Sequence, residues 1–334
     1  MKKHPSAPLL AGLFAAIFLF TSCWQTPGGK QSASNCADPL PSWNNGAVKT
    51  AIVDFVVAVT TEGSASFVPP EDRIATFDND GTLWAEQPVV QIMFVFHRVK
   101  QMAGKNPALK DMQPYKAVIE NDKAYLATMG QNDFLKLFVA TQTGMGLSEY
   151  RKEVAAFFAH AKSPSGKTMR QLRYQPQLEL LDYLRANDFK IYICSGGSDE
   201  FMRVISQDYY GIAPEQVIGT EFKYAFDNEA NEINILPDIK TFNDKEEKPV
   251  NIQHHIGKRP ILACGNEGGR GDVYMLRFSQ ENDYPSLQII VNHDDAEREF
   301  YYQEEDNTSL DRAAKYGWKV ISIKNDWDSV FAGE

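Results

Sequence analysis

Short β segments alternate with helical segments over the second half of this chain, and that alternation restricts its fold more than any other feature. Residues 190–194 (KIYIC) form an apolar run of the kind found in buried parallel strands, and a helical pattern at 178–187 leads into it. Further β segments are expected at 216–219, 260–264, 287–292 and 319–323, and helices at 199–209 and 311–316. The pattern predicts an α/β fold with a doubly wound (Rossmann-like) parallel sheet.

A long helical stretch separates the first β segment from the second. The first β segment, at 73–77, follows two prolines, and helical patterns then occupy 89–103, 115–130, 132–143 and 148–161. A connection of about a hundred residues is expected to fold as a unit of its own or as a lid. A helical pattern at 47–60 precedes the first β segment. We therefore expect an α/β core at 47–84 and 186–334, with a helical cap domain inserted at 85–185.

The N-terminal residues have the pattern of an export signal. Lys2 and Lys3 precede an apolar run at 9–20 that is too short to span a bilayer comfortably, as in signal peptides. The run leads to Cys23, as in bacterial lipoprotein signals, in which this cysteine is lipidated after cleavage. We expect a signal peptide at 1–22 and a polar tether at 23–46 that joins a lipid anchor on Cys23 to the folded part.

Export to the bacterial cell envelope is therefore expected, although neither the membrane nor the leaflet can be named. The alternative is an ordinary secretory cleavage in which Cys23 has no role. The net charge of −10 excludes a general nucleic-acid binder, although a local cluster of donors can still bind a small anion. Four cysteines in 334 residues exclude a disulfide scaffold, and the oligomeric state is not indicated.

Two acids follow the first β segment, within FDNDGTL at 77–83. Because ligands of open α/β sheets bind at the carboxyl ends of the strands, we expect Asp78 and Asp80 to enter a cleft there. One acid can attack an electrophile while the other transfers protons, with a divalent cation suppressing their repulsion. The alternative is an acidic turn in which Asp78 caps a helix.

Two later polar segments also follow β segments. Ser195 and Gly196 come directly after KIYIC, where a hydroxyl and glycine amides can hold a phosphate, although Gly-Ser turns after strands are common. The loop GNEGGRGD at 265–272 carries oxygen ligands that suit a hard cation such as Mg²⁺. Asn266 and Asp272 flank this loop and are the preferred ligands, with Glu267 in reserve. Alternatively, Asp272 only caps the following helix.

The order of these segments over about 71–292 resembles that of the haloacid dehalogenase superfamily of hydrolases. The segment FDNDGTLW is similar to exported bacterial members described as phosphoserine-phosphatase-like. The resemblance implies that Asp78 is a nucleophile that forms an aspartyl-phosphate and that Asp80 is the general acid/base. It implies a phosphate-binding role for Thr82 and Ser195.

A lysine and a metal site complete the family pattern. The resemblance implies that Lys248 steadies the nucleophile and the phosphoryl charge, and Lys248 is preferred over Lys240 and Lys245 because it lies closest to the following helical pattern. By itself, Lys248 would be interpreted as a surface residue. The last family motif usually has two acids four residues apart, whereas Asn266 and Asp272 are six apart and the first is an amide. The implied Mg²⁺ ligands are Asp78, Asp80, Asn266 and Asp272.

The expected function is a Mg²⁺-dependent phosphomonoesterase for a small phosphorylated metabolite. Pyrophosphate is an alternative substrate. A dehalogenase would also use Asp78, but it needs neither Asp80 nor a metal ion. A surface lipoprotein that binds a ligand or glycan without turnover is an alternative from another class. The sequence does not identify the substrate, because residues of the cap determine it.

Overall fold

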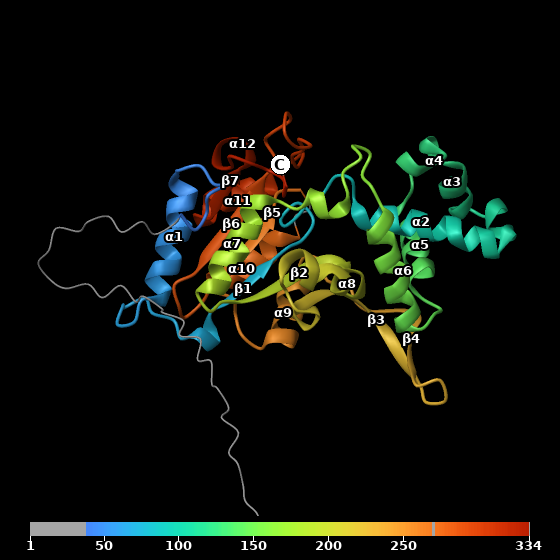
Figure 1. Cartoon of the computed structure of the whole chain (residues 1–334), viewed down its shortest axis with the longest axis horizontal. Helices are drawn as coiled ribbons and strands as arrows, with labels where there is room; N and C mark the ends of the chain where they lie inside the picture. The colour runs from blue at the N-terminus through green and yellow to red at the C-terminus, as the bar shows by residue number, and fades with distance from the viewer. Residues whose placement is uncertain (1–37, 269–270, 334) are drawn as a thin grey trace, which may run out of the picture. The chain divides into compact units, whose positions relative to one another are not determined.

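Seven strands form one sheet in the computed structural model, which describes residues 38–268 and 271–333 (Figure 1). The strands are β1 (Ile74–Phe77), β2 (Lys190–Ser198), β3 (Val217–Asp227), β4 (Glu232–Thr241), β5 (Leu262–Asn266), β6 (Leu287–Asn292) and β7 (Lys319–Ser322). Their order is β4-β3-β2-β1-β5-β6-β7, which places β1 at the centre. Every neighbouring pair is parallel except β3 and β4.

Twelve α-helices accompany the sheet in the described residues. They are α1 (Ala47–Thr60), α2 (Val90–Lys105), α3 (Tyr115–Glu120), α4 (Lys123–Ala127), α5 (Gln131–Gln142), α6 (Leu147–His160), α7 (Gln175–Ala186), α8 (Asp199–Tyr210), α9 (Glu247–Ile256), α10 (Asp272–Gln280), α11 (Thr308–Tyr316) and α12 (Ile323–Asp326). None of the helices in the described part of the chain is long and apolar enough to cross a membrane.

The predicted α/β class and parallel sheet are confirmed. The antiparallel hairpin of β3 and β4 is an addition that the sequence analysis did not include. Strand β4 lies at the edge of the sheet, and only Ile235 of its ten residues is buried, so it lacks the apolar run of a central strand. Pro237 is tolerated there because an edge strand has backbone groups without a strand partner.

The inserted helices α2 to α6 lie between β1 and α7 in the chain and form a group beside the sheet (Figure 1). Helices α5 and α6 contact β4, so the hairpin connects the sheet to this helical group. Helix α7 falls inside the range 85–185 expected for the cap, but it packs against β2 of the sheet. We use "cap" below for helices α2 to α6.

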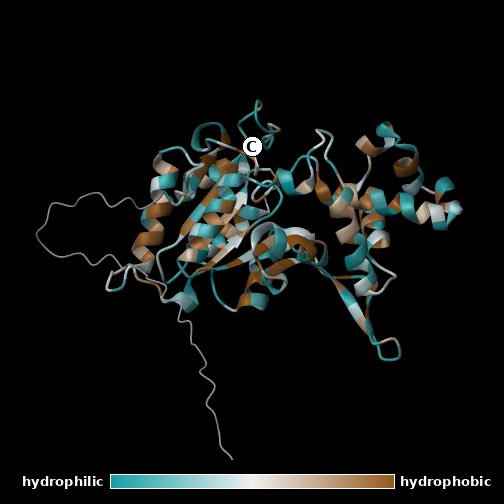
Figure 2. Ribbon diagram, in the orientation of Figure 1, coloured by the Kyte–Doolittle hydropathy of each residue, from teal (hydrophilic) through white to brown (hydrophobic). Residues whose placement is uncertain are grey.

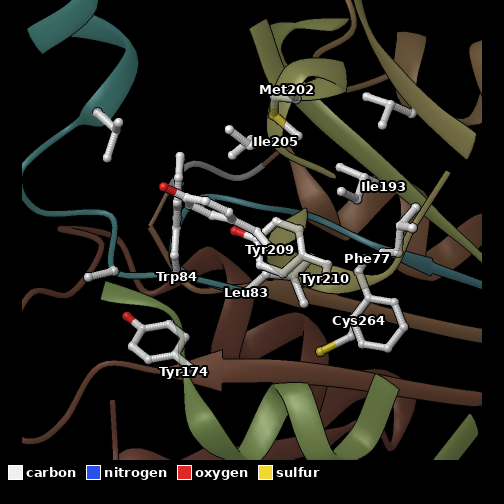
Figure 3. Close-up of a cluster of buried hydrophobic side chains, with 14 of the residues drawn as sticks. Phe77, Leu83, Trp84, Tyr174, Ile193, Met202, Ile205, Tyr209, Tyr210 and Cys264 are labelled. Carbon is white, nitrogen blue, oxygen red and sulfur yellow. The ribbon is translucent and has the colours of Figure 1, made fainter. Parts of the chain in front are cut away.

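Apolar side chains concentrate in the middle of the sheet, where the strands are mostly brown in Figure 2 and the surrounding helices show both colours. All four residues of β1 and all five of β5 are buried. Figure 3 shows part of the core around the segment that follows β1, where Leu83 and Trp84 pack among Tyr209 and Tyr210 of α8. Burial of these large side chains fixes the start of the cap connection against the core.

Candidate active site

The loop that follows β1 is held in place by backbone hydrogen bonds and by the core. The Asp78 amide donates to the Cys264 carbonyl of β5 over 2.9 Å, and the Leu83 amide donates to the Asn79 carbonyl over 2.9 Å. Trp84, which is 1% exposed, donates from Nε1 to Asp80 Oδ1 over 2.9 Å. Both acids are thereby fixed at the carboxyl end of the central strand, as the sequence analysis expected.

A cavity of about 520 Å³ opens at this end of the sheet. Seven residues singled out from the sequence line it: Asp78, Asp80, Ser195, Gly196, Lys248, Asn266 and Asp272. Thr82 is not one of the lining residues; it is fully buried, and its Oγ1 has no hydrogen-bond partner within the described residues. Glu267 is also outside the lining, since its carboxylate accepts a hydrogen bond from the Glu304 amide. Cys23 lies outside the described residues.

Lys248 is the central cation of the site. It lies in the first turn of α9 and is only 3% exposed, and its Nζ lies 2.7 Å from Asp78 Oδ1 and 2.5 Å from Asp272 Oδ1. Burial lowers the pKa of Lys248, but the carboxylates of Asp272 and Asp78 outweigh burial and hold it well above its usual value. Lys248 therefore stays charged, whereas Lys240 is engaged elsewhere, with Glu221 at 2.6 Å.

The two acids of the first loop are both less acidic than a carboxyl group in water. Burial raises the pKa of Asp78 well above its usual value, the carboxylate of Asp272 adds to this, and Lys248 opposes it. Burial also raises the pKa of Asp80, against the hydrogen bond from Trp84. For Asp80, a raised pKa favours the protonated form, which is the form that a general acid needs.

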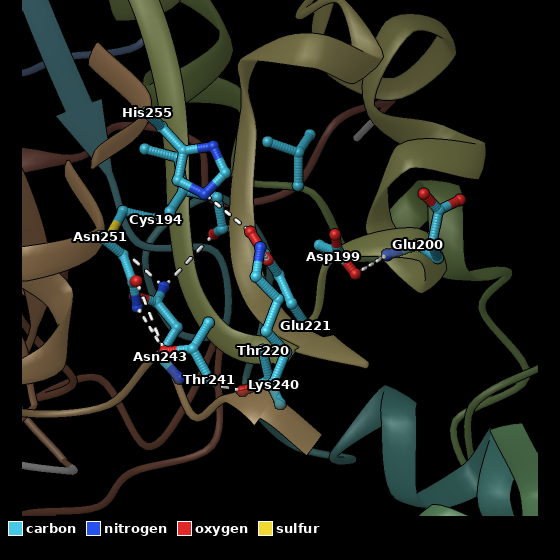
Figure 4. A network of polar contacts seen from close by, with 12 residues as sticks. Cys194, Asp199, Glu200, Thr220, Glu221, Lys240, Thr241, Asn243, Asn251 and His255 are labelled. Carbon is cyan, nitrogen blue, oxygen red and sulfur yellow. Dashed lines mark hydrogen bonds and ion pairs between the residues drawn. The ribbon is translucent and has the colours of Figure 1, made fainter. Parts of the chain in front are cut away.

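Asn243 holds the end of β2 against the segment that leads to α9 (Figure 4). Its Nδ2 donates to the Ser195 carbonyl over 2.8 Å, and its Oδ1 accepts from Asn251 Nδ2 over 2.9 Å. Thr220 Oγ1 of β3 donates to the Gly196 carbonyl over 2.7 Å. These bonds fix the backbone of Ser195 and Gly196, so their position beside Lys248 does not depend on a ligand.

The loop after β5 joins the same charge network. The backbone N–H of Asn266 donates to Asp272 Oδ2 over 2.8 Å, while the other oxygen of Asp272 accepts from Lys248. Asn266 Nδ2 donates to Glu86 Oε2 over 3.1 Å and to the Tyr302 hydroxyl over 2.9 Å. Gly81, with a φ of +72°, allows this approach because a Cβ there would lie 2.1 Å from Asn266 Nδ2.

Four further polar residues line the cavity and were missed in the sequence analysis: Glu86, Gln91, Gln131 and Asp244. Glu86 lies close to the acid pair along the chain, and this proximity was the available signal. Burial raises the pKa of Glu86, and the nearby carboxylate of Asp80 raises it further. Gln91 accepts from the Ser198 amide over 3.3 Å, and its Nε2 has no partner within the described residues. Nothing in the sequence marks Gln91, because its position depends on how α2 packs.

The donor set of the cavity fits a hard divalent cation. The oxygen-bearing side chains of the lining include Asp78, Asp80, Glu86, Asp244, Asn266 and Asp272, and Lys248 is the only cation among the described lining residues. Acidic groups therefore exceed cations, which a divalent ion would offset. No three His, Cys, Asp or Glu side chains of residues 38–268 and 271–333 are grouped to hold a metal ion.

A family model described as haloacid dehalogenase-like hydrolase matches residues 75–277. The matched range covers more than half of the chain and includes the acid pair, Ser195, Lys248 and the loop after β5. The chain belongs to the haloacid dehalogenase-like hydrolase family, which confirms the resemblance noted from the sequence. No curated protein sequence matches the chain.

Solved structures support the same fold. A conserved functionally unknown protein from Anaerococcus prevotii aligns with a TM-score of 0.53 at 14% identity, covering 84% of this chain and 94% of that chain. A protein with unknown function from Bordetella pertussis aligns with a TM-score of 0.50 at 13% identity, covering 75% and 98%.

Proposed function

We propose that this hydrolase is a Mg²⁺-dependent phosphomonoesterase that acts on a small phosphorylated metabolite through an aspartyl-phosphate on Asp78. The observation that carries the proposal is the buried bridge from Lys248 to Asp78 and Asp272, with Asp80 on the wall of the same cavity. A carboxylate that faces a fixed ammonium group is suited to attack a negatively charged phosphoryl group, because the cation offsets the charge that builds up.

The residues divide the reaction into two steps. In the first, an oxygen of Asp78 bonds to phosphorus while the bond from phosphorus to the leaving oxygen breaks, and Asp80 gives its proton to that oxygen. In the second, Asp80 accepts a proton from water as the water oxygen attacks phosphorus, which releases phosphate and restores Asp78. The Ser195 hydroxyl and the Gly196 amide are the proposed donors to the phosphoryl oxygens.

Asp78, Asp80, Asn266 and Asp272 are the proposed residues that hold Mg²⁺: Asp78 through its carboxylate, Asp80 through its backbone carbonyl, Asn266 through its amide oxygen, and Asp272 directly or through water. When bound, the ion neutralises the carboxylates and the phosphoryl oxygens, so that the two anions can approach. Asp80 also distinguishes this function from dehalogenation, which has no alkoxide leaving group to protonate. Its hydrogen bond from Trp84 fixes it on the cavity wall, where proton transfer to the leaving group requires it.

The test measures phosphate release from a panel of phosphate monoesters and pyrophosphate, with Mg²⁺ and with chelator. We expect Mg²⁺-dependent turnover of monoesters, no turnover by Asp78→Asn, and a phosphorylated Asp78 detectable by mass spectrometry after rapid quenching. Asp54→Asn, an exposed acid on α1, is the matched control and should retain full activity. Turnover by Asp78→Asn would refute the assignment of Asp78 as the nucleophile. Cleavage of pyrophosphate alone would change the substrate class, and no turnover would favour a ligand-binding lipoprotein.

We also propose that the protein is exported and anchored in the bacterial cell envelope by a lipid on Cys23. The support is the sequence pattern of residues 1–23, which lie outside the described part of the chain. Wild-type protein is expected in the membrane fraction, and Cys23→Ala is expected to yield a soluble or unprocessed precursor. A bacterial lipoprotein carries several acyl chains, which is enough for stable anchoring. Wild-type protein in the soluble fraction, cleaved elsewhere than before Cys23, would contradict the proposal.

A further inference from the structure

The cavity has an apolar end in addition to its polar end. The apolar side chains that line it come from α5, from β4 and its continuation, and from the segment before α2: Phe134, Leu135, Phe138, Ile239, Phe242 and Val89. Helix α5 belongs to the cap and β4 contacts it, so this end is built by the cap side of the molecule. A substrate held by its phosphate at Lys248 would place its remaining atoms among these side chains.

The apolar end is rigid where it joins the core. The rings of Phe134 and Phe138 lie 6.0 Å apart and those of Phe138 and Phe222 lie 5.7 Å apart, each pair inclined by 29°. Phe138 and Phe222 are 4% and 3% exposed, so the stack is anchored in the protein interior. Its outer member, Phe134, reaches the cavity. A flat aromatic surface of this kind favours contact with another flat apolar group.

Two large apolar side chains of this end are exposed. Leu135 is 37% exposed and Phe242 is 46% exposed, and both line the cavity. Apolar surface in contact with water is unfavourable, and a ligand that covers it gains binding free energy in proportion to the area removed from water. These two side chains therefore offer binding energy to an apolar group.

The charges of the cavity disfavour a substrate with a second anionic group. Among the described lining residues Lys248 is the only cation, and its Nζ is already bound to Asp78 and Asp272. Glu86 and Asp244 add further acidic groups. A carboxylate on the substrate would thus meet like charges, and its transfer from water would not be offset by an ion pair.

We infer that the preferred substrate is a phosphomonoester whose alcohol portion is a neutral aromatic group. The inference rests on the proposed phosphomonoesterase function and names its substrate class. A cavity of about 520 Å³ is of the size that accommodates a small organic ligand of this type. The phosphate binds at Lys248 and Ser195, and the aromatic group lies against Phe134, Leu135 and Phe242. An amino acid or sugar acid bearing a phosphate does not match these surroundings.

The test compares kcat/KM for three phosphate esters, of which the phenylpropyl and propyl esters have leaving alcohols of nearly equal acidity, so that chemistry does not mask binding in that comparison. The panel is 3-phenylpropyl phosphate, propyl phosphate and O-phosphoserine. Covering the phenyl ring removes on the order of 100 Å² of apolar surface from water, so 3-phenylpropyl phosphate is expected to exceed propyl phosphate by roughly 10–100-fold. O-Phosphoserine is expected to be the poorest of the three.

Variants at an exposed position separate specificity from folding. Phe242→Ala is expected to lower kcat/KM for 3-phenylpropyl phosphate about tenfold more than for propyl phosphate. Phe226→Ala is the matched control, because Phe226 is 62% exposed on the same hairpin and does not line the cavity. Calorimetry with 3-phenylpropylphosphonate and propylphosphonate measures the same preference as a ratio of Kd values, without turnover.

The outcomes distinguish the inference from the function on which it rests. Equal kcat/KM for the phenylpropyl and propyl esters, or an equal loss for both in Phe242→Ala, would overturn the aromatic preference and leave the phosphatase intact. If no ester is hydrolysed, the proposed function fails. The ratio of the Kd values of the two phosphonates still shows whether the apolar end of the cavity prefers an aromatic group. A phosphonate ratio near one would then refute the inference by itself.

Discussion

Replacing Lys248 with methionine tests the charge balance at the centre of the site. The Lys248 Nζ is 2.7 Å from Asp78 Oδ1 and 2.5 Å from Asp272 Oδ1, and both acids are less than a tenth exposed. Methionine has a similar length but no charge, so the variant leaves two buried carboxylates without their shared cation. Removing one partner of a buried ion pair costs about 3–5 kcal/mol of unfolding free energy.

That loss is large enough to measure as a melting temperature. In a domain of this size 1 kcal/mol shifts Tm by about 2–4 °C, so we expect Lys248→Met to lower Tm by roughly 6–20 °C at neutral pH. Asp78→Asn is expected to be as stable as the wild type or more stable. Burial and the carboxylate of Asp272 raise the pKa of Asp78, so its charge opposes folding and the amide relieves the repulsion.

The assay is thermal and urea unfolding followed by circular dichroism, in the presence of chelator so that no divalent cation stabilises the carboxylates. The double variant Lys248→Met/Asp78→Asn serves as the control, and it should recover part of the lost stability because one of the two unpaired charges is gone. Two results would refute the reasoning. One is a loss of less than about 1 kcal/mol in Lys248→Met, and the other is an equal loss in Asp78→Asn.

Two further predictions concern proton transfer and acid stability. Asp80→Asn should lower turnover by roughly 10²–10⁴. The loss in the phosphorylation step should be smaller for nitrophenyl phosphate, because its leaving group needs no proton. If burst-phase kinetics show equal losses in this step for nitrophenyl phosphate and for an alkyl phosphate, Asp80 has only a structural role. Hydrogen bonds from His255 and Lys240 lower the pKa of Glu221 from 4.5 to about 2. The contribution of Glu221 to the free energy of unfolding is therefore fully present above pH 4.5 and lost as pH falls through 2. Between these pH values the wild type should lose about 1 kcal/mol more unfolding free energy than Glu221→Gln, once solvent screening is allowed for. If the unfolding free energies of the wild type and Glu221→Gln, measured with urea, change in parallel across this pH range, this prediction is wrong.

The residues of the site could be found from the sequence where each directly follows an apolar strand. Asp78, Ser195 and Asn266 lie at or just after the buried parts of β1, β2 and β5, and parallel strands bring such positions to one edge of the sheet. Lys248 has no such marker. Its burial results from the position of α9 beside β2 and α10, and in the sequence it has the surroundings of a surface lysine.

Local conformation explains where the observed secondary structure differs from that predicted from the sequence. The expected helical stretch at 115–130 is divided into α3 and α4, because Asn121 adopts a left-handed conformation with a φ of 54°. Asp122 then accepts hydrogen bonds from the Ala124 and Tyr125 amides and begins α4. Asparagine tolerates this conformation better than most residues, but the sequence does not show that it adopts it here. The hairpin strand β4 was missed because its exposed edge position removes the apolar pattern.

The central position of β1 has a consequence for how the chain acquires its structure. Both neighbours of β1 come much later in the chain, since Phe77 is followed by more than a hundred residues before β2 begins at Lys190, and β5 begins only at Leu262. Contacts between residues so distant in sequence form late, because closing a long loop costs conformational entropy before any pairing is gained. A chain that ends before Leu262 would leave one edge of β1 unpaired, because Leu262, Ala263 and Cys264 are its partners in β5. We therefore expect the loop that carries Asp78 and Asp80 to become ordered only after the cap and most of the sheet have formed.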